Sequence, residues 1–169
     1  MRTVAQMMLA VDSPLAAYRA AAEAQDTAGM LACMREDVVL SSPITDRFTF
    51  AGKAQMRDLL EDVHAVVGDV TYVADAGDGR TRLLTLSARV GRQRMDEAVL
   101  VTLDEDGLIA TLQLFVRPLP GLTAIAAELG PRVARRRGRG RALAVRAMIA
   151  PLAFLSGRGE GVASKLASP

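Results

Sequence analysis

Residues 70–116, VTYVADAGDGRTRLLTLSARVGRQRMDEAVLVTLDEDGLIATLQLFV, decide the fold. Apolar and polar residues alternate in four segments of this stretch, and short turns rich in glycine and aspartate separate the segments. The four segments are residues 70–76, 81–90, 94–103 and 108–116. A period of two is typical of strands that bury one face, and short turns of this kind connect antiparallel neighbours. The stretch therefore predicts a four-stranded antiparallel meander.

Helical spacing dominates the residues before the meander. Ser13-Pro14 has the features of an N-cap followed by a first helical position, and Asp26 is suited to cap a second, short helix. The apolar residues between Met56 and Val67 repeat at helical spacing in a third helix. Short strands are expected at residues 38–43 and 47–50. Because helices and strands are grouped rather than alternated, the sequence predicts an α+β fold.

Five stretches carry a resemblance to a known family. They are Ala17-Tyr18, residues 26–30, residues 38–43, Phe50-Ala51-Gly52 and residues 106–109. In their order, they resemble the nuclear-transport-factor-2-like superfamily, and its SnoaL-like branch most, over about residues 13–117. The resemblance implies a cone-shaped domain, in which a curved antiparallel sheet wraps around three N-terminal helices and leaves an apolar pocket at one end. Its members include isomerases, hydrolases, polyketide cyclases and non-catalytic scaffolds, so the fold transfers better than the function.

Two activities of this superfamily need residues that are missing here. Ketosteroid isomerases use a tyrosine on the first helix, which Tyr18 matches, and an aspartate base on the first strand. Ser42 occupies that second position and cannot accept a proton near neutral pH. Limonene-epoxide hydrolases use two aspartates bridged by an arginine. Arg94-Met95-Asp96 has the spacing of one such pair on a later strand than expected, and Gln113 replaces the other aspartate. We expect neither activity by its known route.

The remaining polar residues give a candidate acid–base site. Asp96 and Glu97 are neighbours in a strand, so they point to opposite faces and only one can enter a pocket. We assign Asp96 as the candidate base or acid, because burial among apolar side chains would raise its pKa, with Tyr18 or His64 as its partner. The alternatives are a carboxylate at the edge or rim that pairs with Arg82 or Arg94, and a helix-end His64 that satisfies nearby carbonyls or faces solvent.

An apolar pocket of this kind suits a small, largely apolar ligand, with isomerase, cyclase or hydratase chemistry. The residues expected to line it are Leu15, Met30, Met34, Ser42, Leu60, Val63, Leu100 and Gln113. Neither a metal nor another cofactor is expected, because a single histidine and Cys33, the single cysteine, cannot form a usual zinc site. One cysteine also excludes an internal disulfide, which fits a cytoplasmic bacterial protein.

The chain changes character after residue 117. Residues 1–116 carry a net charge of −6 and residues 117–169 carry +8. Helices are predicted at residues 122–129 and 142–155, and the first is expected to end at Gly130-Pro131. The second has 14 residues, fewer than the roughly 20 that cross a bilayer. Six arginines lie close together between these helices: Arg132, Arg135, Arg136, Arg137, Arg139 and Arg141.

The basic segment has two interpretations. It either contacts an anionic membrane or a protein partner, or its second helix covers the domain's own sheet or a partner subunit. Nucleic acid is not expected, because Phe154 is the only aromatic residue there that could stack on a base. We divide the chain into a SnoaL-like cone domain, residues 13–117, and a basic, partly helical extension, residues 118–169, with residues 157–169 as a flexible tail. The alternative function is a non-catalytic homodimeric assembly module that binds its partner through this extension.

Overall fold

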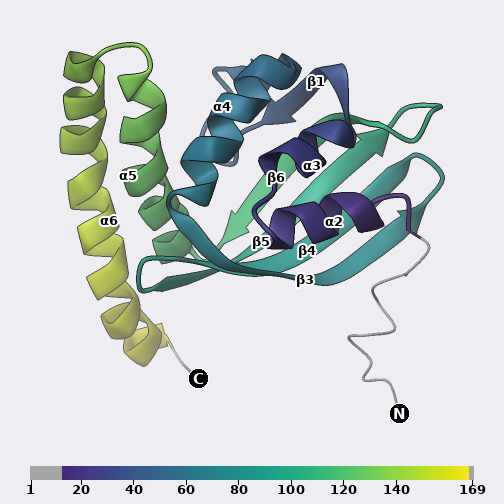
Figure 1. Cartoon of the computed structure of the whole chain (residues 1–169). Helices are drawn as coiled ribbons and strands as arrows, with labels where there is room; N and C mark the ends of the chain where they lie inside the picture. Colours follow the sequence, from purple (N-terminus) through teal and green to yellow (C-terminus); the bar gives the residue numbers. More distant parts are fainter. Residues whose placement is uncertain (1–12, 168–169) are drawn as a thin grey trace.

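A computed structural model describes residues 13–167, and the side chains of residues 13–159 (Figure 1). The described residues form five helices: α2 (Ala16–Glu23), α3 (Thr27–Ala32), α4 (Gly52–His64), α5 (Leu119–Arg135) and α6 (Arg139–Ala167). They also form six strands: β1 (Met34–Ser41), β2 (Thr49–Ala51), β3 (Val67–Asp78), β4 (Thr81–Val90), β5 (Gln93–Leu103) and β6 (Ile109–Arg117). The predicted α+β class is confirmed.

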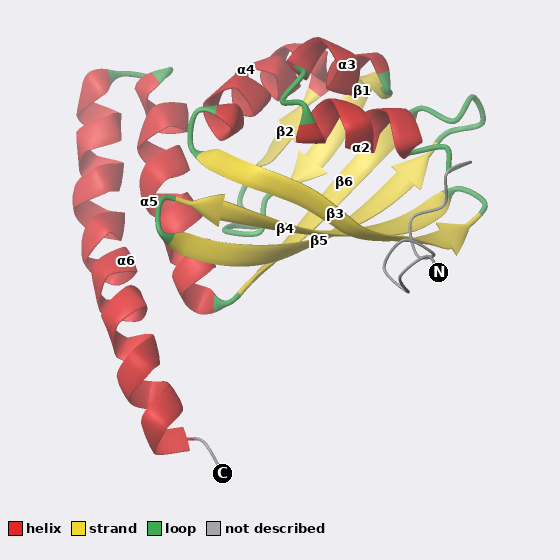
Figure 2. Cartoon of the chain, turned by 60° about the horizontal axis from the view of Figure 1, so that its bottom comes forward, coloured by secondary structure: helices red, strands yellow, loops and turns green. Residues whose placement is uncertain are grey.

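The six strands form one curved sheet in the order β2-β1-β6-β5-β4-β3. The predicted meander from β3 to β6 is antiparallel throughout, as expected. The sheet as a whole is mixed, because β1 runs parallel to β6 with Ser41 beside Gln113. Helices α2, α3 and α4 lie against one face of the sheet, and its strands bend around them (Figures 1 and 2). This arrangement gives the open cone that the sequence predicts.

Local sequence signals explain where the first helices lie. The Asp26 side chain accepts a hydrogen bond from the Gly29 backbone N–H at 3.0 Å, so Asp26 caps α3 as predicted. In α4, Met56, Leu59 and Leu60 are buried, as a helix with one apolar face requires. The cap fixes where α3 begins, and the apolar face fixes α4 against the inner face of the sheet.

The first strand is longer than predicted. Residues 35–37, which precede the strand predicted at residues 38–43, belong to β1, because Met34 already pairs with Ile109 of β6. The pairing shifts register between Met34 and Val39, which is typical of a bulge. Met34 is fully buried by this pairing.

The C-terminal extension is more helical than predicted. Helix α5 continues through Pro131, and α6 continues to Ala167 through Pro151 and through residues expected to be a tail. Residues 168–169 of that tail lie outside the described residues. The two helices form a hairpin (Figure 2), and Gly130 of α5 packs so closely on α6 that an added Cβ would lie 3.2 Å from Val145. Packing between the helices therefore outweighs the local cost of proline.

Helix α5, rather than α6, covers the end of the sheet. An added Cβ on Gly121 would lie 2.8 Å from the Cβ of Met95 in β5, so only glycine allows α5 to approach this strand so closely. Helix α6 lies on the far side of α5 (Figures 1 and 2). The Thr123 and Ser156 hydroxyls are 2.6 Å apart and join the two helices near the open end of the hairpin. The alternative in which the second helix covers the domain's own sheet is therefore wrong.

A buried ionic cluster connects the start of α2 to the sheet. The Asp75 carboxylate of β3 accepts hydrogen bonds from the Ser13 hydroxyl and from Arg82 Nε, the latter at 2.7 Å. Arg19 of α2 lies 3.4 Å from the same carboxylate. The Asp75 side chain has no exposed surface, so these partners replace its water.

Candidate functional site

A cavity of about 640 Å³ lies between the inner face of the sheet, helices α2 to α4 and the α5–α6 hairpin. Most of its lining is apolar, including Met30 of α3, Leu60 of α4, Val99 of β5 and Ile125 of α5. The segment that carries Ile44 and Phe48 borders it, and both of these side chains are exposed. The hairpin therefore closes an apolar hollow that the cone would otherwise leave open.

Glu97 of β5 is the only carboxyl side chain among the described residues that line this cavity. Along β5, Met95, Glu97 and Val99 share one side of the strand, and all three line the hollow. Burial raises the pKa of Glu97 from its ordinary value to about 7. The Glu97 carboxyl can therefore both hold and release a proton near neutral pH.

Two tyrosines stand beside this carboxyl. Tyr18 of α2 and Tyr72 of β3 line the cavity and share a side-chain hydrogen bond. Burial, and secondarily the negative charge of Glu97, raise the pKa of Tyr18. Burial is also the main reason that the pKa of Tyr72 is raised. Both hydroxyls consequently stay protonated and can donate hydrogen bonds.

These three groups are suited to acid–base chemistry. A carboxyl with a pKa near the working pH is an efficient proton acceptor and donor, and a protonated phenol can stabilise a developing oxyanion. The apolar wall strengthens both effects, since water competes less in such a site. The site can therefore move a proton on an apolar molecule that carries one polar oxygen.

Asp96, the acid assigned from the sequence, does not line the cavity. Its exposed side chain lies 3.6 Å from Arg117 Nε, on the face of β5 that points away from the helices. The alternative of a surface carboxylate paired with an arginine fits this position, but the partner is Arg117 rather than Arg82 or Arg94. The alternation of Met95, Val99 and Val101, all buried, is the sequence signal that selects Glu97 instead. The candidate acid is therefore Glu97 rather than Asp96.

Tyr18 and His64, the other two candidates, do line the cavity. Nδ1 of His64 lies 3.1 Å from the Thr27 hydroxyl. Burial lowers the pKa of His64, and the nearby charge of Asp26 opposes this shift in part. The imidazole is therefore neutral near pH 7 and bonded at the end of α4. Tyr72 is the residue that the sequence analysis did not single out.

The predicted lining residues fall into three groups. Met30, Ser42, Leu60 and Val63 line the cavity. Leu15 and Met34 are buried in the core beside it rather than in its wall. Leu100 and Gln113 lie opposite each other on β5 and β6, on the outer face of the sheet. Both are one position out of phase with the inward residues Val99 and Leu112, which explains the difference.

The clustered arginines also separate by position. Arg137 and Arg141 line the cavity at the hairpin turn, and Arg135 and Arg139 are exposed. Arg136 instead binds α4 through the carboxylates of Asp58 at 2.7 Å, Asp62 at 2.9 Å and Glu61 at 3.6 Å. These carboxylates also raise the pKa of Arg136, chiefly through the hydrogen bond to Asp62. Arg136 is therefore a tether between the hairpin and the cone.

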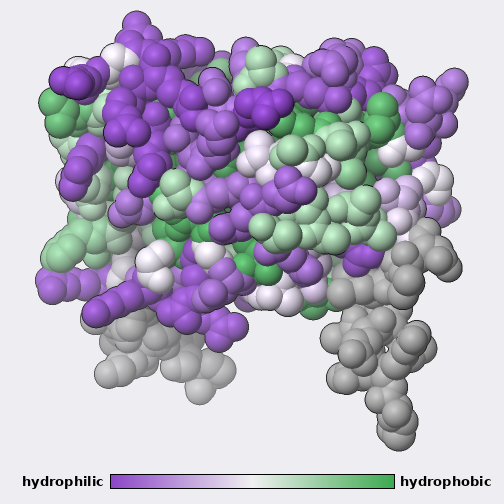
Figure 3. All heavy atoms as spheres, viewed as in Figure 1, coloured by the Kyte–Doolittle hydropathy of each residue, from purple (hydrophilic) through white to green (hydrophobic). Residues whose placement is uncertain are grey.

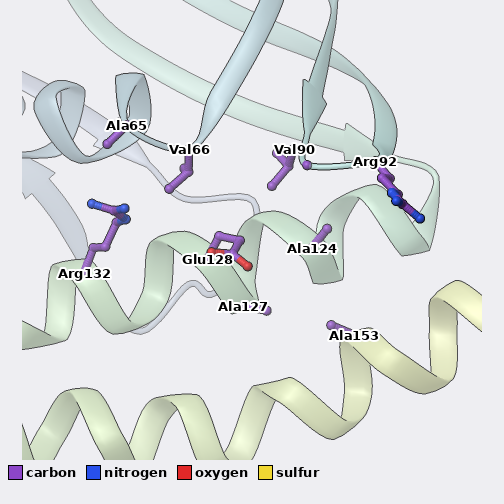
Figure 4. A pocket seen from close by; sticks show the side chains of 10 residues that line it. Ala65, Val66, Val90, Arg92, Ala124, Ala127, Glu128, Arg132 and Ala153 are labelled. Atoms are coloured by element: carbon purple, nitrogen blue, oxygen red, sulfur yellow. The ribbon is translucent and has the colours of Figure 1, made fainter.

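Arg132 lies in a second, shallower groove of about 470 Å³ between α4, the β4–β5 turn and the hairpin. Figure 4 shows Glu128 in this groove, with Arg92 towards one end and Arg132 towards the other, among small side chains such as Ala124. Glu128 and Arg92 are exposed to solvent. Hydrated charges of this kind lack the burial that raises the pKa of Glu97, so we place the candidate site in the larger cavity.

Metal ligands are not grouped in the part of the chain that the structure describes. No cluster of three or more histidine, cysteine, aspartate or glutamate side chains suited to a metal ion occurs there. Cys33, whose pKa is raised by burial, donates to the Gly29 carbonyl at 3.4 Å. The chemical groups of the candidate site are thus the Glu97 carboxyl and the Tyr18 and Tyr72 hydroxyls.

Comparison with known proteins places this arrangement in a family. Residues 15–112 match the SnoaL-like domain. A crystal structure of a steroid delta-isomerase from Pseudomonas aeruginosa is similar with a TM-score of 0.65 and 30% identity, over 76% of this chain and 98% of that protein. No curated protein matched the chain.

Two further solved structures share the fold. A protein with a cystatin-like fold from Silicibacter pomeroyi has a TM-score of 0.65 and 25% identity, over 79% of this chain and 92% of its own. A putative ketosteroid isomerase from Kribbella flavida has a TM-score of 0.56 and 17% identity, over 62% of this chain and 76% of its own. The match over residues 15–112 covers more than half of the chain. The protein described here therefore belongs to the SnoaL-like domain family.

Proposed function

We propose that the cavity binds a small, largely apolar carbonyl compound and moves a proton from one of its carbon atoms to another. The observation that carries this proposal is Glu97, a lone carboxyl in an apolar wall with a pKa of about 7. The cavity volume of about 640 Å³ is within the range of sites for small organic molecules. The 30% identity to a protein described as a steroid delta-isomerase is consistent with this chemistry.

The proposed reaction has two proton transfers. The Glu97 carboxylate removes a proton from the carbon next to the carbonyl, and the electron pair of the broken C–H bond moves onto the carbonyl oxygen. Tyr18 donates a hydrogen bond to the resulting enolate oxygen, while Tyr72 donates to Tyr18. The electron pair then returns from the oxygen through a neighbouring carbon–carbon double bond of the substrate to a different carbon, which takes the proton from Glu97. The C=O bond is re-formed, the carbon–carbon double bond has moved, and the Glu97 carboxylate is restored. Ser42 has no part in this route.

Proton exchange measures this reaction without knowledge of the natural substrate. The probe is an apolar β,γ-unsaturated cyclic ketone in D₂O, followed by NMR for both deuterium uptake and migration of the double bond. We expect turnover by the unchanged protein, and a loss of about 10²-fold or more in Glu97→Gln. Asp96→Asn is the matched control on the opposite face of the same strand and should retain full rate. Full activity in Glu97→Gln would contradict the assignment.

A second, non-catalytic role is favoured by the outer face of the sheet. One large apolar side chain on each of four strands is exposed there: Val73, Leu83, Leu100 and Phe115. This face suits a homodimer, because pairing two copies would remove these side chains from water. Sedimentation equilibrium tests the proposal: Phe115→Asp should shift a dimer to monomer, and a chain that stays monomeric without the substitution would exclude it.

A further inference from the structure

Helix α6 has an apolar outer face that the rest of the described chain leaves uncovered. Five large side chains on it are each more than half exposed: Leu143, Met148, Leu152, Phe154 and Leu155. Helical geometry places them on either side of a strip of small exposed residues that includes Ala147 and Pro151. Figure 3 shows apolar side chains between strongly hydrophilic ones at the edge that α6 occupies in Figure 1.

Positive charge borders this apolar face. Arg139 and Arg141 precede it, Arg158 follows it, and Arg146 is exposed between them. Within residues 119–159 the single acidic residue is Glu128. Apart from Arg136, no arginine of the described hairpin forms an ion pair with an acidic group. Arg158 lies over the Phe154 ring, 4.3 Å from its centre, so its charge is held against the apolar surface.

The charge indicates what kind of surface can cover α6. A second copy of the chain, paired through this same face, would bring two sets of unpaired arginines together. An anionic surface removes that repulsion, and an anionic lipid bilayer also accepts the apolar side chains. The geometry therefore favours a lipid surface with negative headgroups.

Helix α6 is longer than the 14-residue helix predicted at residues 142–155. Its length therefore no longer excludes a helix that crosses a bilayer. Its part Arg139–Gly159 has 21 residues, is apolar enough to cross a bilayer by composition alone, and has no buried residue. However, Arg146 lies within it, and Ser156 and Val145 hold it along α5. These contacts leave one side of α6 on protein, which suits a helix that lies flat at an interface.

We infer that α6 docks on anionic membranes, parallel to the surface, with its five large apolar side chains below the headgroups and its arginines on lipid phosphates. Each such arginine raises the affinity by about fivefold. The inference does not depend on the chemistry of the cavity. Docking would nevertheless place the cavity close to the membrane surface, because Arg141, Val145 and Ile149 of the docking helix also line the cavity.

Vesicle sedimentation with the full chain tests the inference. Phosphatidylcholine vesicles with and without phosphatidylglycerol are compared at low and high salt. We expect binding to the anionic vesicles that falls with salt, and a loss of about tenfold or more for Leu152→Ser with Leu155→Ser. Arg139→Gln with Arg158→Gln should cost about as much. All four side chains are exposed, so circular dichroism should show an unchanged fold.

Matched controls come from outside the α5–α6 hairpin. Arg47→Gln and Arg80→Gln remove exposed charges from the loop before β2 and from the β3–β4 turn, and both should keep full vesicle binding. The inference is overturned by equal binding to neutral vesicles, by no binding to either kind, or by controls that lose as much as the α6 variants. Protein that resists alkaline carbonate extraction would show a membrane-spanning helix instead. Self-association lost in the α6 variants, without vesicle binding, would assign the face to a second copy.

Discussion

The hydroxyl groups of Tyr18 and Tyr72 are hydrogen-bonded to each other, which joins α2 to β3 in the wall of the cavity. They are the only two tyrosines of the chain. The negative charge of Glu97 opposes the ionisation of both, so the carboxyl and the two hydroxyls respond to one another.

Tyr72→Phe removes the partner that orients the Tyr18 hydroxyl. We expect kcat on the unsaturated ketone to fall by about fivefold, since one neutral hydrogen bond contributes about 1 kcal/mol. KM should stay unchanged, because Tyr72 would act on the substrate only through Tyr18. Steady-state kinetics separates the two constants. A raised KM with unchanged kcat would instead mean that Tyr72 contacts the bound ligand.

Glu97 makes the stability of the protein depend on pH in a defined direction. Its pKa is about 7 in the folded chain and 4.5 without burial, so between these values the folded state keeps a proton that the unfolded state has lost. Stability therefore falls as pH rises through this interval and stays lowered above it, by up to about 3 kcal/mol.

Urea denaturation of the protein and of Glu97→Gln, at about pH 5 and about pH 8, measures this dependence. The difference between the two proteins removes the contribution of every other titrating group. We expect Glu97→Gln to be the more stable protein at the higher pH and to lose most of that advantage at the lower one. A difference that does not change with pH would mean that the Glu97 carboxyl is hydrated.

Asp75→Asn should unfold the chain more easily, because it leaves the buried Arg82 without its counter-charge at 2.7 Å. Breaking one side of a buried ion pair costs about 3 to 5 kcal/mol. Thermal unfolding measures the loss. Asp69→Asn is the control, since Asp69 is exposed and lies 3.8 Å from Arg89, and it should change stability by less than about 1 kcal/mol.

Arg136→Gln should loosen the hairpin while the cone stays folded. Arg136 contacts Asp58, Glu61 and Asp62 of α4, and such partly exposed networks contribute about 1 kcal/mol. Hydrogen–deuterium exchange should quicken in α5 and α6 and stay constant in β3 to β5. Arg135→Gln, which removes an exposed neighbour, is the control. Equal protection in both variants would mean that packing alone holds the hairpin.

The sequence predicts the meander well, because a period of two and short turns are local signals. The same period indicates which carboxylate of β5 points inward, because Met95, Val99 and Val101 are in phase with Glu97 and not with Asp96. The phase of these apolar residues therefore distinguishes the inward carboxyl from the outward one. The parallel pairing of β1 with β6 has no such local signal, since it joins distant parts of the chain.

Long-range packing decided the features that the sequence did not predict. Pro131 and Pro151 lie inside helices because each helix is supported by its neighbour in the hairpin. Leu15 and Met34 belong to the core whereas Met30 lines the cavity, and all three are apolar residues of the same stretch. Whether an apolar side chain faces a neighbour or a hollow depends on where the other elements leave space, which composition does not encode.

The parallel contact between β1 and β6 also sets an order of events during synthesis. Strand β1 is among the first elements to be made, but its neighbour in the centre of the sheet, β6, is the last strand of the chain. The nascent polypeptide must therefore hold its early apolar segments without their final partners until translation has passed Arg117. Only then can the hairpin close over the hollow, so a released chain that ends before Leu119 would leave the apolar wall of the cone exposed to chaperones.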